Sequence, residues 1–298
     1  MFGFPTQTRM LYGSFPKQLP ADDTVDRNQE IALSTFAPGT EVIKDKKVLK
    51  SVGFIDFKRI FRGIVPKDGL NRLAGTKLCY CLSCNMSTLV KENEPHVCCV
   101  CGSQLNGRDV ASPLGYCVEF NKKPDDFTGR FDWVPMTSDV SLDISKFQIN
   151  MKELKDSSIL YGVNGSDNKG TINTVNTNSG KGFYLKKTKA NGWVDPMLIT
   201  HSEEKNGRGE IYTGEECTVD LLASKVTGIL EIQLNLPASG KINISVEDSE
   251  ERRMIVMSAF LSWGTLLRKS IVSYLDVDLA ELSMNYCIIR DKKTGKLV

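Results

Sequence analysis

Two pairs of cysteines constrain this chain more than any other feature of its sequence. They follow the spacing C-x2-C-x13-C-x2-C, with Cys81 and Cys84 in the first pair and Cys98 and Cys101 in the second. Two intervening residues let both thiolates of a pair point at one ion, and two such knuckles supply the four sulfurs of a closed tetrahedral zinc site. A closed site has no open position for a substrate water, so we expect a structural zinc.

The remaining cysteines leave alternatives open. Six of the nine cysteines lie between Cys79 and Cys101, and in a cytosolic chain such clustering favours metal binding over disulfides. Four cysteines also suit an iron–sulfur cluster. Cys79, Cys99 and His96 are close enough in sequence to replace one of the four ligands. In the simplest alternative the spacing arises by chance and these thiols are buried without a metal.

Hydrophobic periodicity predicts an α+β fold, in which a β-rich body carries an inserted zinc knuckle module and a long C-terminal helix. From Val256 to Tyr274, apolar residues recur at spacings of three and four, which predicts a helix over about 249–275. Asp248 and Glu251 have the spacing of a capping box at its start.

These patterns divide the chain into three segments. Residues 1–74 hold an irregular N-terminal arm of about 30 residues, followed by short strands that include Ile31–Leu33. Residues 75–110 form the zinc-binding module, and residues 111–298 form a β-rich domain that ends with the long helix.

The sequence contains no self-sufficient catalytic motif. The patterns G-x-x-x-x-G-K-[ST], G-x-S-x-G and H-E-x-x-H do not occur, and the two histidines are His96 and His201. We therefore predict no catalytic residues and do not expect this chain alone to be an enzyme. A stand-alone metalloenzyme would need an open metal site and a base, and neither is apparent.

Composition excludes several classes but says little about partners. Hydrophobic residues make up 41% of the chain, charged residues 25%, and the net charge is +2, as in a globular protein. No run of about 18 uncharged apolar residues occurs, so we expect no membrane span. Met1 is followed by Phe2-Gly-Phe-Pro without a basic or apolar leader, and we expect a cytoplasmic protein.

Local basic clusters are candidate nucleic-acid contacts. Cations interleaved with Phe57 and Phe61 suit the phosphates and bases of a single strand, and further arginines lie on the predicted helix. In the alternative interpretation, these cations form a solvated face that nearby acids balance. The candidates are Lys44, Lys46, Lys47, Lys58, Arg59, Arg62, Arg252, Arg253 and Arg268.

Several segments resemble the C-terminal region of large DEAD/DEAH-box superfamily 2 helicases, which carries an MrfA-type zinc-binding domain. Helicases of this kind occur in the DISARM and Druantia antiphage systems. The segments that carry the resemblance are Met1–Arg9, Ile31–Lys46, the two cysteine pairs, Pro113–Tyr116, Asp126–Trp133, Ser262–Arg268 and Leu275–Asp278. The resemblance implies ATP-dependent translocation on DNA, with a zinc domain that braces the motor and helps to guide a strand. Only the four cysteines of the two pairs correspond to a known role.

The resemblance gives a specific expectation for this chain. In the family, two RecA-like motor lobes precede the matching region, and no P-loop occurs here. The chain thus resembles a fragment, one half of a split helicase or a decayed remnant. We expect a fragment or split subunit that works with a helicase motor in cis or in trans, with zinc as cofactor and DNA as partner. The alternative is a zinc-stabilised protein–protein adaptor in a defence complex that does not contact nucleic acid.

Overall fold

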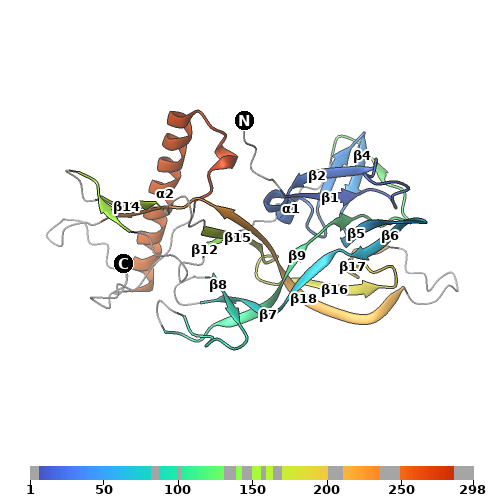
Figure 1. Ribbon diagram of the computed structural model, residues 1–298, viewed down its shortest axis with the longest axis horizontal. Helices are drawn as coiled ribbons and strands as arrows, with labels where there is room; N and C mark the ends of the chain where they lie inside the picture. Colours follow the sequence, from blue (N-terminus) through green and yellow to red (C-terminus); the bar gives the residue numbers. More distant parts are fainter. Residues whose placement is uncertain are drawn as a thin grey trace. The chain divides into compact units, whose positions relative to one another are not determined.

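Strands dominate the part of the chain that the computed structural model describes, and one long helix follows them (Figure 1). The β-rich body and the C-terminal helix of the predicted α+β fold are therefore confirmed. The described residues are 7–81, 87–98, 102–130, 139–142, 150–155, 159–163, 170–200, 211–234 and 249–284.

The chain divides into two units. Unit 1 consists of Met1–Leu78, Arg108–Asp139 and Thr174–Ser224, and unit 2 consists of Cys79–Gly107, Val140–Asn173 and Lys225–Val298. The predicted zinc module, 75–110, agrees to within four residues at each end with the first segment of unit 2. The predicted segment 111–298 contributes to both units.

Unit 1 is built on a mixed sheet with the strand order β2-β1-β10-β5-β17-β16-β18-β9-β7, and β6 pairs with β5. Strand β1 runs parallel to β10, and β18 runs parallel to β9. The bounds are β1 (Thr8–Tyr12), β2 (Thr24–Asn28), β5 (Gly53–Ile60), β6 (Gly63–Asp68), β7 (Leu70–Tyr80), β9 (Asn106–Pro113), β10 (Tyr116–Cys117), β16 (Phe183–Thr188), β17 (Trp193–Val194) and β18 (Tyr212–Thr227). A second sheet has the order β11-β4-β3, formed by β3 (Glu41–Lys44), β4 (Lys47–Lys50) and β11 (Asp125–Asp126).

Phe54 lies at the centre of the core of unit 1. Its partners on the two neighbouring strands are Tyr116 and Trp193, and all three side chains are fully buried. A Cβ atom on the adjacent Gly53 would lie 2.1 Å from the carbonyl oxygen of Trp193, so only glycine fits there. The indole Nε1 of Trp193 donates to Oδ1 of Asp68 at 3.0 Å, which satisfies the one polar atom of this buried side chain.

The prediction of an irregular arm over the first 30 residues was wrong. Strands β1 and β2 pair there in antiparallel register over five positions, from Thr8↔Asn28 to Tyr12↔Thr24. Pro16 and Pro20 lie in the connection between the two strands, where their missing N–H groups interrupt no ladder.

The predicted strand Ile31–Leu33 was also wrong, because these residues lie in helix α1 (Gln29–Thr35). The side chain of Asn28 accepts a hydrogen bond from the backbone N–H of Glu30 at 3.2 Å and caps the helix. Ala32 and Leu33 are buried in the core. An apolar run of three residues does not distinguish a strand from a buried helical turn.

Unit 2 contains a three-stranded sheet in the order β13-β14-β19 and the long helix α2 (Glu250–Leu275). Strands β8, β12 and β15 also contribute to unit 2, where β15 pairs with β12. The bounds are β8 (Ser87–Lys91), β12 (Asp139–Leu142), β13 (Lys152–Glu153), β14 (Ile159–Val163), β15 (Gly170–Asn176) and β19 (Leu230–Leu234).

Helix α2 confirms the helix predicted over about 249–275, but its cap differs from the predicted one. The hydroxyl of Ser249 accepts from the backbone N–H of Arg252 at 3.1 Å, so Ser249 is the N-cap; Asp248 lies outside the described residues. At the other end, Asp276 adopts a left-handed conformation with φ 53°, and the short helix η3 (Leu279–Glu281) follows.

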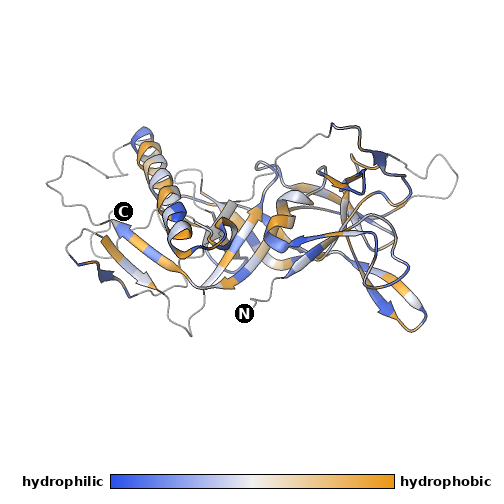
Figure 2. Ribbon diagram, turned by 90° about the horizontal axis from the view of Figure 1, so that it is seen from above, coloured by the Kyte–Doolittle hydropathy of each residue, from blue (hydrophilic) through white to orange (hydrophobic). Residues whose placement is uncertain are grey.

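The apolar residues that recur at spacings of three and four from Val256 to Tyr274 form a stripe along α2. Their side chains are half-buried, as predicted, except that of Tyr274, which is 89% exposed. Hydrophobic residues run along much of the helix and hydrophilic ones gather toward its ends (Figure 2). Because several large apolar side chains also lie off the stripe, α2 keeps an exposed apolar surface, formed by Met254, Ile255, Leu261, Leu266 and Leu275.

By length and composition, Met254–Leu275 is the one helix among the described residues that could cross a membrane. Its best window has a mean hydropathy of 1.2, and none of that window is buried. Arg268 and Lys269 lie within this helix, and a charged residue at the centre of a span costs roughly 2.5–3.5 kcal/mol. The helix is therefore weak evidence for a membrane span.

A buried ion pair in unit 1 gives a test of this fold. Nη1 of Arg108 lies 2.8 Å from Oδ1 of Asp220, whose side chain is fully buried, and Nη2 of Arg108 donates to the Gly180 carbonyl oxygen at 2.7 Å. We predict that Arg108→Ala lowers the free energy of unfolding by about 3 kcal/mol, because it leaves a buried carboxylate without its guanidinium. Urea denaturation measures this loss.

The control is Lys122→Ala, which removes an exposed pair with Asp125 and should change the unfolding free energy by less than about 0.5 kcal/mol. Equal effects of the two variants would contradict the buried ion pair.

Candidate metal centre and nucleic-acid contacts

Cys98 lies in a tight hairpin within unit 2. The Cys98 N–H donates to the Ser103 carbonyl oxygen at 2.8 Å, and the Leu105 N–H donates to the His96 carbonyl oxygen at 2.9 Å. The Gly102 N–H donates back to the Cys98 carbonyl oxygen at 2.9 Å, with Gly102 at φ +74°. This left-handed residue closes the turn that begins at Cys98, as a glycine after a C-x2-C pair allows.

Cys81 follows directly on β7, and β8 begins at Ser87. Cys81 therefore lies immediately after a strand, and Cys98 lies at the tip of a hairpin. Both cysteines belong to one buried cluster, with exposed fractions of 1% and 4%. The first cysteines of the two pairs are thus brought into a common core, as one shared metal site requires.

The other two predicted ligands, Cys84 and Cys101, lie outside the described residues, as does Cys99. Within the described ranges, no three His, Cys, Asp or Glu side chains are grouped so that they could hold a metal ion. Cys79 shares the buried cluster with Cys81 and Cys98, yet these three described thiols do not form such a group. Their arrangement therefore weighs against Cys79 as a third ligand. A four-thiolate site at the two pairs needs Cys84 and Cys101 to complete it.

Helix α2 packs on this cysteine cluster. Val256 and Met257, in the second turn of the helix, contact the buried cluster of Cys79, Cys81, Val90, Cys98 and Leu105. Val256 belongs to the predicted apolar stripe, but no local signal in the sequence identified the cysteines as its partner. The buried cysteine cluster and the long helix therefore share one core.

The structure separates the predicted nucleic-acid residues into paired and exposed groups. Nζ of Lys44 lies 3.3 Å from Oδ1 of Asp23, and Lys47 forms an ion pair and a hydrogen bond with Asp126. The Lys47 contact lowers the pKa of the Asp126 carboxyl. These two lysines are thus neutralised by acids of unit 1, as the alternative interpretation expects.

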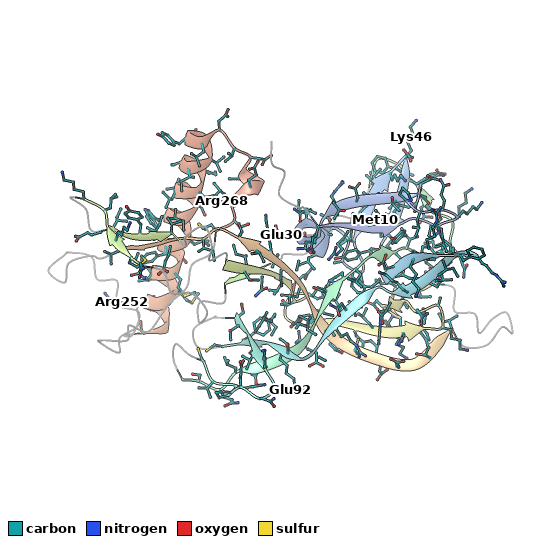
Figure 3. All side chains as sticks on the ribbon, viewed as in Figure 1. Met10, Glu30, Lys46, Glu92, Arg252 and Arg268 are labelled. Carbon is teal, nitrogen blue, oxygen red and sulfur yellow. The ribbon has the colours of Figure 1, made fainter. Side chains whose placement is uncertain are left out.

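Lys46 lies at the turn between β3 and β4, with φ 61°, and projects away from the strands (Figure 3). It is exposed, and the described structure shows no ion pair to it. Lys46 is therefore an isolated exposed cation beside two paired ones.

Lys58, Arg59 and Arg62 lie together on the hairpin formed by β5 and β6. All three are exposed, and none forms an ion pair in the part of the chain that the structure describes. Phe61, at the tip of the same hairpin, has an exposed fraction of 103%. Among the predicted basic residues whose side chains the structure describes, those on this hairpin remain clustered and available.

The predicted arginines of α2 belong to unit 2. The side chain of Arg252 is half-buried, and that of Arg253 lies outside the described part. Nη2 of Arg268 donates to the Leu279 carbonyl oxygen and ties η3 to the helix (Figure 3). This contact gives Arg268 a role within unit 2.

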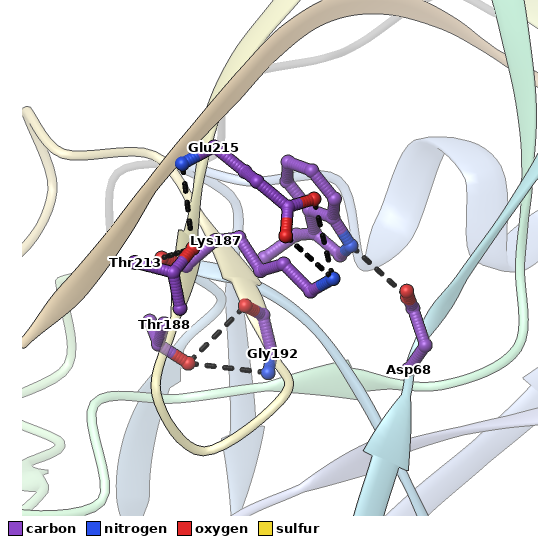
Figure 4. Close-up of polar contacts among 7 residues, drawn as sticks. Asp68, Lys187, Thr188, Gly192, Thr213 and Glu215 are labelled. Atoms are coloured by element: carbon purple, nitrogen blue, oxygen red, sulfur yellow. Dashed lines mark hydrogen bonds and ion pairs between the residues drawn. The ribbon is translucent and has the colours of Figure 1, made fainter.

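Another basic stretch, on β16, contacts an acid and aromatic rings within unit 1 (Figure 4). Nζ of Lys187 lies 3.2 Å from Oε1 of Glu215 and 5.6 Å from the ring centroid of Trp193. Lys186 lies over the ring of Tyr212 at 5.5 Å. These lysines stabilise the sheet surface through ion-pair and cation–π contacts.

Two thiols outside the cysteine cluster, Cys117 and Cys217, have raised pKa values. Burial raises the pKa of Cys117 to about 12 and that of Cys217 to about 11. Cys117 is buried in the core of unit 1, and Cys217 is half-buried against that unit; Cys287 lies outside the described residues. A raised pKa suppresses the thiolate that binds metals and reacts with electrophiles.

We predict that iodoacetamide at pH 8 leaves Cys117 unmodified in the folded chain, whereas denaturation exposes it to full alkylation. The shift from 9.0 to about 12 lowers its thiolate fraction roughly a thousandfold, and its burial blocks access. Peptide mass spectrometry reads out each site. Complete modification of Cys117 in the native chain would show that this core is wrong.

Comparison with known proteins does not identify a family. No protein-family model matches the chain, and no curated protein or solved structure is significantly similar to it.

Proposed function

We propose that this chain is a zinc-stabilised, non-motor module of a DNA helicase or translocase. In this proposal Cys81, Cys84, Cys98 and Cys101 hold one zinc ion, and unit 1 contacts DNA. The supporting observation is the burial of Cys81 and Cys98, one from each C-x2-C pair, in a single cluster. The helicase resemblance supplies the motor partner and a role in cytoplasmic antiphage defence.

Zinc fits the described donors. The cluster offers thiols, which are ligands for zinc, and the hairpin bonds around Cys98 hold its backbone in a closed turn. An iron–sulfur cluster uses the same four ligands and is the competing occupant. With all four positions taken by protein, the metal stabilises the fold and does not activate water.

DNA binding is the second part of the proposal. It is supported by the exposed cations on the β5–β6 hairpin, where no acid neutralises them among the described residues. Cations of this kind bind phosphate and release counterions, which makes affinity dependent on salt. The sequence has no P-loop, so we propose that ATP hydrolysis resides in a separate motor.

A protein–protein adaptor is the second candidate function, and the exposed side of α2 favours it. Ile255 and Leu266 are 62% and 65% exposed, which is unusual for large apolar residues on a surface helix. In this alternative the zinc is a scaffold and α2 binds a protein partner of the complex. Salt-insensitive capture of a protein, without DNA binding, would favour it over the first candidate.

We predict about one zinc per purified chain and less than about a tenth as much in Cys81→Ser or Cys98→Ser. Removing one thiolate opens the tetrahedral site, and a structural zinc contributes roughly 10–16 kcal/mol to folding. Elemental analysis measures both zinc and iron, and limited proteolysis should show that unit 2 becomes susceptible while unit 1 persists.

The controls are two cysteines placed outside the site. Cys217→Ser changes a half-buried thiol of unit 1 and should retain zinc; Cys79→Ser tests the neighbouring thiol and should also retain it. Iron in place of zinc would assign a cluster, and a metal-free wild-type chain would reject the proposed site.

We predict that the chain binds DNA without hydrolysing ATP, with affinity falling at least about tenfold as salt rises from roughly 50 to 200 mM. Fluorescence anisotropy and a phosphate-release assay measure the two properties. ATP hydrolysis by this chain alone would contradict the separate motor. DNA affinity that does not change with salt would contradict binding through exposed cations.

A further inference from the structure

The β5–β6 hairpin extends from a buried base to an exposed tip. Six register pairs join its strands, from Ile55↔Asp68 to Ile60↔Gly63, and Phe61 and Arg62 form the two-residue connection (Figure 1). Phe57 is only 6% exposed and packs in the core, whereas the next three residues of β5 are all exposed. Strand β5 therefore becomes exposed immediately after Phe57, whereas Ile64 on β6 still packs against the core.

Phe61 makes the tip unusual. Its exposed fraction of 103% means that it contacts almost nothing in the folded chain. Burying a phenylalanine side chain is worth roughly 1.5–3 kcal/mol, so this exposure forgoes a substantial gain in stability. The two aromatic residues within β5, Phe54 and Phe57, are buried. An aromatic ring held away from the core on a hairpin is available to a ligand.

The charge around Phe61 identifies the kind of ligand. Residues 57–66 contain three cations, Lys58, Arg59 and Arg62, and no carboxylate. Nearer the base, Nζ of Lys67 is neutralised by Oδ2 of Asp56 at 2.7 Å. Adjacent residues of a strand point to opposite faces, so Lys58 and Arg59 place positive charge on both faces of the hairpin. The tip thus combines an apolar ring with flanking charge that suits an anionic polymer.

We infer that the tip of the β5–β6 hairpin binds single-stranded nucleic acid, with Phe61 stacked on an unpaired base. Lys58, Arg59 and Arg62 contact the adjacent phosphates. Stacking needs an open base face, which a continuous duplex conceals, so the site selects a single strand or a junction. This inference rests on the proposed DNA contact and adds its binding element and strand preference.

The test uses the full zinc-loaded chain and an oligothymidylate of about 20 nucleotides, longer than the roughly 4–16 nucleotides that one binding domain covers. We expect Phe61→Ala to weaken single-strand binding roughly 5- to 150-fold, the range found for loss of one base–aromatic stack. Binding to a duplex of the same length should change less than about twofold, because phosphate contacts remain.

Two substitutions separate stacking from hydrophobicity. Phe61→Trp keeps an aromatic face and should retain or strengthen binding, whereas Phe61→Leu keeps apolar area without the face and should weaken it nearly as much as alanine. Tyr274→Ala removes another exposed aromatic ring, 89% exposed, and should leave affinity unchanged. Full affinity in Phe61→Leu would overturn the stacking role.

Substitution of the cations should change the salt dependence of binding, which substitution of Phe61 should not. The double variant Arg59→Gln/Arg62→Gln should reduce the slope of log affinity against log salt by about 1.4 on a single strand, and Phe61→Ala should leave that slope nearly unchanged. Because all these side chains are exposed, thermal unfolding should not change, which excludes misfolding as the cause of weaker binding.

The outcomes separate this inference from the proposed function. A wild-type chain that binds no nucleic acid would overturn both. Salt-dependent DNA binding that is equal in wild type and Phe61→Ala would overturn only the hairpin site. Phe61-dependent binding to phosphatidylserine vesicles, without binding to the oligonucleotide, would assign the tip to an anionic membrane surface and overturn the inference.

Discussion

The shared burial of Cys81 and Cys98 is the constraint on which the account of unit 2 depends. The buried cluster around them contains Cys79, Val90 and Leu105 and no other buried residue among those described. Burying one Val or Leu side chain contributes roughly 1.5–3 kcal/mol, whereas a structural zinc contributes roughly 10–16 kcal/mol. A bound metal would therefore be the largest single stabilising term in this core, and α2 packs on the core that it would hold together.

Buried apolar and aromatic side chains form the core of unit 1. Phe54, Tyr116 and Trp193 form a continuous apolar centre across three neighbouring strands, and this core contains no candidate metal ligand set among the described residues. A second buried cluster of unit 1, which includes Tyr12, holds the base of the β5–β6 hairpin at Phe57, and the tip at Phe61 is solvated. In the proposed function, the metal would therefore stabilise unit 2, and the exposed cations and Phe61 on the β5–β6 hairpin of unit 1 would contact nucleic acid.

The sequence predicted the features that depend on local pattern. The stripe from Val256 onward extends over five turns, so the bounds and the half-buried side of α2 were correct. Three apolar residues at Ile31–Leu33 were too few to distinguish a strand from helix α1. The pairing of β1 with β10 joins Leu11 to Tyr116, and no local signal encodes a contact over that separation.

Nor does the sequence indicate which cations are paired with acids. Lys47 is paired with Asp126, a residue 79 positions away, and Lys44 with Asp23, so only the fold reveals that these cations are balanced. The exposed tip at Phe61 had a partial signal, since a two-residue connection followed by Gly63 is typical of a hairpin. Its complete exposure is a property of the fold that this local pattern does not predict.

X-ray absorption spectroscopy of the purified chain at the zinc edge tests the central claim most directly. A site formed by the two cysteine pairs predicts four sulfur neighbours at about 2.3 Å and no nitrogen or oxygen ligand. A first shell that contains nitrogen or oxygen at about 2.0–2.2 Å, or a chain without bound metal, would contradict it.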